Sequence, residues 1–169
     1  MSQYEDRSLL CSSPSMNHEM NYPSLIDREY KRYMLQDNSD LCYLRHPSGV
    51  IVVTLNKKHP AMRKRITKVD WQMGKHKQLD RSRQKVVGKA KKGGLALMAD
   101  TKLCELECND GTRYVLRAGI KANLVEVNDR LAADPELIRE HPENTGYIAV
   151  FIPYAGDRRK TPTVFSEDD

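Results

Sequence analysis

Residues 124–150 read LVEVNDRLAADPELIREHPENTGYIAV, a stretch in which a strand, a helix and a second strand follow one another. Its beginning, extended by one residue to NLVEV (123–127), is rich in strand-forming residues. Its centre, DPELIREH (134–141), predicts a helix. Its end, continued to GYIAVFIP (146–153), is mostly apolar and predicts a last, buried strand. A sheet protein with brief helices is therefore expected.

Two short helices carry recognisable start signals. In the helix over 134–141, Asp134 can cap, Pro135 suits the first helical position, and Glu136 favours the positive end of the dipole. After Pro23, Ser24 and Asp27 imitate a capping box. The apolar stripe expected on this first helix consists of Leu25, Tyr33 and Met34.

The remaining ordered sequence consists of short strands. LCYLRH (41–46) and GVIVVTL (49–55) flank a Pro-Ser-Gly turn and predict a hairpin. KLCELE (102–107) and TRYVLR (112–117) predict further strands, and ITKVDWQM (66–73) alternates with period two. The face predicted to point into the core comprises Thr67, Val69, Trp71 and Met73, while Ile66, Lys68, Asp70 and Gln72 form the other face. Many short strands and turns predict an all-β sandwich or barrel.

Asn109-Asp110-Gly111 marks the tip of a hairpin. Asp-Gly favours a tight primed turn, because both residues tolerate positive φ. In the strand before the tip, Cys104, Leu106 and Cys108 point to one face while Glu105 and Glu107 point to the other. The cysteines are predicted to be buried small hydrophobic residues in a reduced compartment, not metal ligands or disulfide partners.

The sequence predicts one domain between two polar tails. Residues 1–20 are expected to be a flexible N-terminal tail, 21–153 the folded domain, and 154–169 a flexible C-terminal tail. No apolar run reaches the roughly 18 residues of a membrane span, and the N-terminus does not resemble a secretion signal. An intracellular protein is expected.

Positive charge is concentrated in the middle of the chain. Residues 57–92 hold fourteen Lys and Arg against two Asp, a net charge of +12, so the remaining residues carry −7 of the total of +5. Such a region attracts a polyanion: nucleic acid, acidic lipid or an acidic protein such as an actin filament. The alternative is a solvated loop whose charge serves solubility. The predicted partner-binding residues are Lys57, Lys58, Arg63, Lys64, Arg65, Lys75, Lys77, Arg81, Arg83, Lys85, Lys89, Lys91 and Lys92.

Enzyme chemistry has no support in the motifs. The five histidines are widely spread and none is paired with a nucleophile or a metal ligand; structural roles are predicted for His46, His59 and His141. There is no dinucleotide fingerprint, phosphate loop or nucleophile elbow. A non-enzymatic protein without catalytic residues, metal or cofactor is predicted.

The stretch 124–150 resembles the end of the glycine-cleavage H protein, with its Val-Glu-Val-Asn strand, Asp-Pro-Glu-Leu helix and Gly-Tyr closing strand. The resemblance implies a mainly β barrel-sandwich hybrid, H-protein- or lipoyl-domain-like, with short helices and flexible termini. That family carries lipoate on a lysine at a hairpin tip, and the equivalent place falls on or beside Gly111. No lysine lies between Lys102 and Lys121. The tip is therefore predicted to be a bare turn, and a lipoyl carrier is disfavoured.

Most of the chain, from about Tyr22 to Pro153, is similar to the Abitram (Simiate) family. The shared motifs are Pro-Ser-Leu-Ile-Asp-Arg (23–28), His59-Pro60, Gly-Lys-Ala-Lys-Lys-Gly (88–93), and Glu-Val-Asn (126–128) through Gly-Tyr-Ile-Ala-Val (146–150). The resemblance implies a protein that binds actin monomers and filaments and modulates actin polymerisation and filopodia formation. It also implies a nuclear pool at speckles, linked to transcription, and a cytoplasmic pool that includes growth cones, dendrites and lamellipodia.

Three functional hypotheses follow. The first is an actin-binding protein whose basic region contacts an acidic partner, with an affinity that falls as salt rises. The second is a nuclear factor that uses the same region to bind nucleic acid or the transcription machinery. The third, a lipoyl carrier, is disfavoured by the absent lysine.

Overall fold

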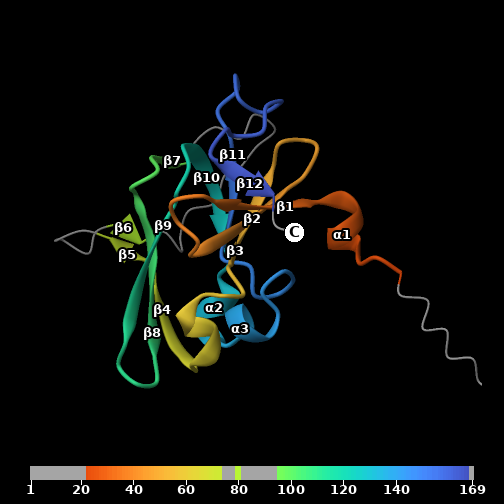
Figure 1. Cartoon of the computed structure of the whole chain (residues 1–169). Helices are drawn as coiled ribbons and strands as arrows, with labels where there is room; N and C mark the ends of the chain where they lie inside the picture. The colour runs from red at the N-terminus through yellow and green to blue at the C-terminus, as the bar shows by residue number, and fades with distance from the viewer. Residues whose placement is uncertain (1–21, 74–78, 81–94, 168–169) are drawn as a thin grey trace, which may run out of the picture.

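The computed structural model describes residues 22–73, 79–80 and 95–167. Two antiparallel sheets form most of this part (Figure 1). The larger sheet has the strand order β12-β1-β2-β3-β11-β10-β7, and the smaller has the order β4-β8-β9. The bounds of the larger sheet's strands are β1 (Lys31–Leu35), β2 (Leu41–Arg45), β3 (Ile51–Leu55), β7 (Leu95–Leu97), β10 (Ala122–Val127), β11 (Ala149–Ile152) and β12 (Phe165–Glu167). Those of the smaller sheet are β4 (Ile66–Asp70), β8 (Lys102–Cys108) and β9 (Arg113–Arg117), and β5 (Gln72–Met73) pairs separately with β6 (Leu79–Asp80).

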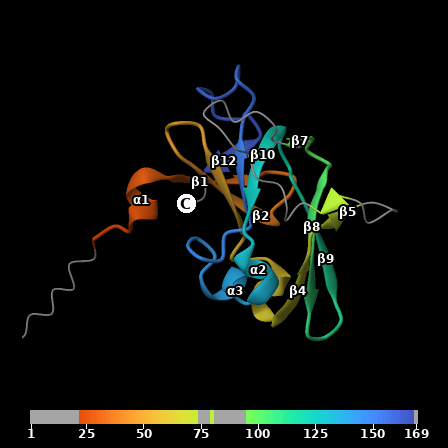
Figure 2. The same ribbon diagram turned by 180° about the vertical axis from the view of Figure 1, so that it is seen from behind.

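Short helical elements complete the structure. They are α1 (Leu25–Glu29), the 3₁₀ turn η1 (Pro60–Arg63), α2 (Arg130–Ala133) and α3 (Leu137–Glu140). Figure 2 shows α2 and α3 side by side at one end of the sheets, and α1 apart from the main body. The mainly β architecture predicted from the strand pattern is confirmed.

The core lies between the two sheets and draws side chains from both. The larger sheet buries Tyr43, Ile51 and Phe151, and the smaller buries Leu106 and Leu116. Full burial of one such side chain contributes about 1.5–3 kcal/mol. The predicted burial of Cys104, Leu106 and Cys108 on one face of β8 is confirmed, and none of the three described cysteines forms a disulfide.

The hairpin predicted across residues 41–55 forms in the expected register, with Leu41 opposite Leu55 and Arg45 opposite Ile51. Gly49 at its turn has φ +93°, a conformation that L side chains rarely adopt. At the second tip, Gly111 also has a positive φ, +82°. Its N–H donates to the carbonyl of Cys108, whose N–H donates to the carbonyl of Thr112. This is a three-residue loop closed by glycine, one residue longer than the predicted primed turn.

The first helix is shorter than its apolar stripe suggested. The Ser24–Asp27 capping box is present, but α1 ends at Glu29 and buries none of its residues. Tyr33 and Met34 belong to β1, where Tyr33 is opposite Tyr43 of β2 and stacks on Phe165 of β12. The strong pairing of an aromatic residue within the sheet overrides the helical spacing of the sequence.

The alternation in β4 is interrupted by a bulge. The register with β8 shifts between Ile66 and Lys68, so Ile66 is buried and Thr67 is exposed, the reverse of the prediction. Val69 and Trp71 are buried as predicted. An extra residue at a bulge moves the residues before it to the opposite face.

The helix predicted over 134–141 divides into two. Asp134 ends α2 by donating its N–H to the carbonyl of Arg130, and it does not cap α3 through its side chain. Glu136, expected to act on the helix dipole, accepts a hydrogen bond from the N–H of Ile66 at 2.6 Å. This tertiary contact at the start of β4 adds to the local ion pair that Glu136 makes with Arg139 of its own helix.

The C-terminal boundary also differs from the prediction. Strand β11 is buried as expected but is not the last, because residues 165–167 form β12 on the edge of β1. Phe165 packs on the rings of Tyr33 and Tyr43, with centroids 5.1 Å away in each case. Three aromatic rings therefore hold part of the expected tail on the domain. The predicted N-terminal tail, residues 1–20, lies outside the described residues.

Candidate interaction site

Residues 57–65, which hold all the predicted partner-binding residues that the structure describes, are here called the basic segment. Asn56 connects the end of β3 to this segment, and its polar side chain is buried. The N–H of Asn56 donates to the carbonyl of Asp40, and its side-chain oxygen accepts from the N–H of Lys58, both at 3.0 Å. The backbone that enters the basic segment is therefore fixed from within.

His59 fixes the next turn. The side chain is buried, and Nδ1 accepts a hydrogen bond from the N–H of Ala61 at 3.1 Å, which caps η1. Nε2 lies 3.6 Å from the carboxylate of Asp40, and the ring meets Tyr114 edge-on at 4.9 Å. Burial lowers the pKa of His59, against the opposing effect of Asp40. The structural role predicted for His59 is confirmed.

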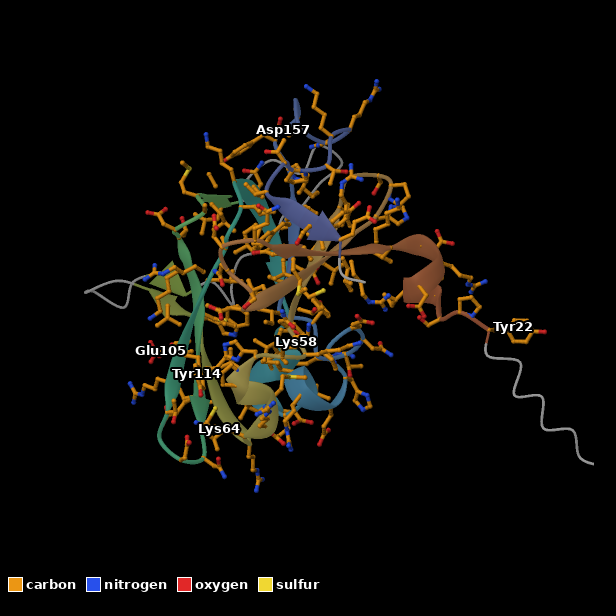
Figure 3. All side chains as sticks on the ribbon, in the orientation of Figure 1. Tyr22, Lys58, Lys64, Glu105, Tyr114 and Asp157 are labelled. Atoms are coloured by element: carbon orange, nitrogen blue, oxygen red, sulfur yellow. The ribbon has the colours of Figure 1, made fainter. Side chains whose placement is uncertain are left out.

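Four cations of the basic segment point to solvent. Lys57 and Lys58 precede η1, Arg63 is its last residue, and Arg65 follows it; all four are exposed. Figure 3 shows Lys58 near the middle of the view and Lys64 below it and to the left. Because the backbone is fixed by Asn56 and His59, exposed positive charge is presented on a defined loop.

Lys64 differs from its neighbours because it binds the hairpin tip. Its Nζ lies 2.7 Å from a carboxylate oxygen of Asp110 and 3.1 Å from the hydroxyl oxygen of Thr112. It also lies 5.5 Å from the ring centroid of Tyr114, a cation–π distance. The interactions with Asp110 and Tyr114 raise the pKa of Lys64 to about 12, and Lys64 holds the pKa of Asp110 well below its usual value.

The hairpin tip predicted to be a bare turn is therefore an anchored one. Besides the contacts of Lys64, the N–H of Asn109 donates to the carbonyl of Arg65 at 2.9 Å. The side chain of Asp110 also accepts from the N–H of Thr112 at 3.0 Å. Sequence reasoning missed this anchoring, because Lys64 and Thr112 are 48 positions apart and nothing local connects them.

A cleft borders the basic segment on the side of α1. It has a volume of about 460 Å³ and is lined by Lys57, residues 24–26 and residues 141–144. Arg32 holds its two sides together: the guanidinium binds both carboxylate oxygens of Glu143 at 2.6 Å and Asp27 at 2.7 Å. The paired guanidinium lowers the pKa of Glu143 below its usual value.

Of the thirteen predicted partner-binding residues, five are described. The structure brings Lys57, Lys58, Arg63 and Arg65 together as exposed cations and commits Lys64 to the tip. The remaining eight lie outside the described residues: Lys75, Lys77, Arg81, Arg83, Lys85, Lys89, Lys91 and Lys92.

In residues 22–73, 79–80 and 95–167, no three His, Cys, Asp or Glu side chains are grouped so that they could hold a metal ion. None of the described helices is long and apolar enough to cross a membrane.

The fold defines the class to which the domain belongs. A solved glycine-cleavage H protein from Mycobacterium marinum superposes with a TM-score of 0.53, over 73% of this chain and 84% of that chain, at 18% identity. The domain is thus an H-protein-like barrel-sandwich hybrid, as predicted. No lysine occupies residues 103–120, which include its hairpin tip.

The relatives by sequence are more specific. Proteins named Protein Abitram are 33% identical in Xenopus tropicalis, over 81% of this chain and 78% of the relative, and 33% identical in Homo sapiens, over 78% and 75%. An uncharacterised protein of Caenorhabditis elegans is 43% identical over 82% of this chain and 86% of its own length. No protein-family model matches the chain. The chain belongs to the Abitram family.

Proposed function

We propose that this protein is a non-enzymatic actin-binding protein that modulates actin polymerisation and filopodia formation. It binds monomers and filaments and has a nuclear pool linked to transcription. The proposal is supported by membership of the Abitram family, together with the functions that the family resemblance implies.

The observation that carries the proposal to named residues is the basic segment. Four cations, Lys57, Lys58, Arg63 and Arg65, are exposed on a loop whose backbone is fixed by buried Asn56 and His59. A loop ordered before binding loses little conformational entropy when a partner binds, so its charge contributes to affinity more fully. An actin surface rich in carboxylates is the matching partner, and the rate and strength of association fall as salt screens the charges.

The test is co-sedimentation with actin filaments at about 0.05 M and about 0.15 M salt. The first variant changes Lys57, Lys58, Arg63 and Arg65 to Gln and leaves Lys64, which stabilises the hairpin tip, in place. A matched control removes the same number of exposed cations elsewhere, at Arg28, Lys31, Arg158 and Arg159.

The wild type and the control variant are expected to pellet with filaments, and the affinity of the first variant is expected to fall at least about tenfold. Thermal unfolding of both variants checks that they remain folded. If the control loses as much affinity as the first variant, the basic segment is not the contact. If no form pellets with filaments or binds monomers while the wild type retards DNA or RNA on a gel, the nuclear hypothesis replaces the actin hypothesis.

A further inference from the structure

A groove lies far from the basic segment: Figure 3 places Asp157 beside the upper end of the molecule and Lys64 at the lower end. Two adjoining cavities form it. One, of about 370 Å³, lies between residues 119–121 and residues 157–164 with Pro153. The other, of about 470 Å³, lies between residues 35–38 and the C-terminal residues Thr163 and Val164. The two cavities lie side by side, because both are lined by Ala99, Gly119, Thr163 and Val164.

Small residues and backbone form the floor of the groove. The N–H of Gly119 donates to the carbonyl of Ala99 at 2.8 Å, so two loops cross closely where neither has a large side chain. Gly119 has φ +76°, and a Cβ built there would point to Tyr43 and Leu35. The outer wall is the segment that leads from β11 to β12, which β12 fixes by pairing with β1. The groove is therefore built from fixed elements on both sides.

Charge is distributed unequally along the groove. Lys121 and Lys160 line the first cavity, and Asp157 offsets them only in part. Asp37 and Asp100 line the second cavity. Between the two ends, Val164 is 51% exposed, a large apolar side chain in contact with solvent. The groove thus has a positive end, an apolar centre and a negative end.

We propose that this groove binds an extended segment of a partner protein, in which an aliphatic residue lies between acidic residues on one side and basic residues on the other. The acidic residues bind at Lys121 and Lys160, the aliphatic residue contacts Val164, and the basic residues bind at Asp37 and Asp100. The size supports this assignment, since ligand pockets usually measure about 300–1,000 Å³. The proposal does not depend on the actin-binding function, because it uses other residues.

Fluorescence anisotropy of a labelled peptide tests the proposal with the full-length chain. The probe is acetyl-Glu-Asp-Ser-Val-Ser-Lys-Arg-amide. It has acidic residues at one end and basic residues at the other, and its blocked termini carry no charge. Binding of the wild type is expected to be saturable. Replacing the probe's Val by Ser, or its two acidic residues by Lys, is expected to weaken binding at least about fivefold.

Charge reversal identifies the site. The K121E/K160E variant is expected to lose at least about fivefold in affinity for the first probe and to regain it with the probe whose acidic residues are changed to Lys. The variant with Arg63 and Arg65 changed to Gln is expected to bind the first probe like the wild type. Equal loss in that variant would assign the peptide to the basic segment and overturn the proposal, as would absence of saturable binding. Because both charge-reversed sites are exposed, the variants are expected to stay folded, which thermal unfolding checks.

Discussion

Replacing Gly119 by alanine probes the packing of the loop between β9 and β10 against β1 and β2. Gly119 has φ +76°, and an added Cβ would lie far inside van der Waals contact with the hydroxyl of Tyr43 and with Cδ1 of Leu35. The hydroxyl of Tyr43 cannot move freely, because it donates to the carbonyl of Ala118 at 2.7 Å within the core. Gly111 is the natural control: its φ is +82°, but a Cβ there meets no atom within 4 Å.

The two glycines separate backbone strain from steric overlap. A left-handed conformation costs an alanine about 1–2 kcal/mol relative to glycine, and this cost applies at both positions. Overpacking adds about 1–3 kcal/mol at Gly119 only. We therefore expect a loss of unfolding free energy of about 2–5 kcal/mol for Gly119→Ala and about 1–2 kcal/mol for Gly111→Ala.

Urea unfolding followed by circular dichroism measures both losses, and the gap of about 2 kcal/mol corresponds to about 4–8 °C in Tm. The double variant Tyr43→Phe/Gly119→Ala removes one of the two overlapping groups. The loss of unfolding free energy in the double variant is expected to be about 1 kcal/mol smaller than the sum of the losses in the two single variants. Equal losses at Gly119 and Gly111, or a purely additive double variant, would refute the packing described around Tyr43.

Three further predictions concern separate parts of the molecule. The pKa of His59 is lowered in the folded state, so the unfolded chain binds the proton more readily, and the free energy of unfolding is expected to fall as pH decreases below about 6.5. The variant His59→Gln should flatten this part of the pH profile in thermal melts. An unchanged slope would contradict the assignment. Arg32→Gln should lower the free energy of unfolding by about 2 kcal/mol and speed hydrogen exchange in α1, because that helix has no buried residues of its own. Unchanged exchange in α1 would show that Arg32 does not hold the helix. Co-expression with a lipoyl ligase should leave the intact mass unchanged, because no lysine lies between Lys102 and Lys121, and a lipoylated species would overturn the assignment of the tip.

Local sequence signals located most strands. Gly49 and Gly111 sit where alternating segments change direction, and hairpins form at both because turn chemistry and strand pattern agree. The capping box at Ser24 likewise starts a helix where it was expected. The H-protein-like fold was foreseeable from the strand, helix and strand of residues 124–150, although the helix divides in two.

The differences arise where a distant contact outweighs a local preference. Glu136 binds the N–H of Ile66 in addition to Arg139 of its own helix, and Lys64 binds Asp110 instead of facing solvent like Arg63. The spacing of residues within each segment does not predict either contact. For the basic segment, sequence identified the charge but could not show that buried His59 fixes the loop that carries it.

The pairing of β12 with β1 constrains how the chain can fold while it is being synthesised. Ser166 donates to the carbonyl of Met34, a contact that spans 132 positions, so the outer edge of β1 is formed early and covered late. Until residues 165–167 leave the ribosome, β1 presents open hydrogen-bonding groups and Tyr33 lacks the ring that stacks on it. A nascent chain stalled before that point would be prone to associate with another, and chaperone dependence should be greatest until residues 165–167 have emerged.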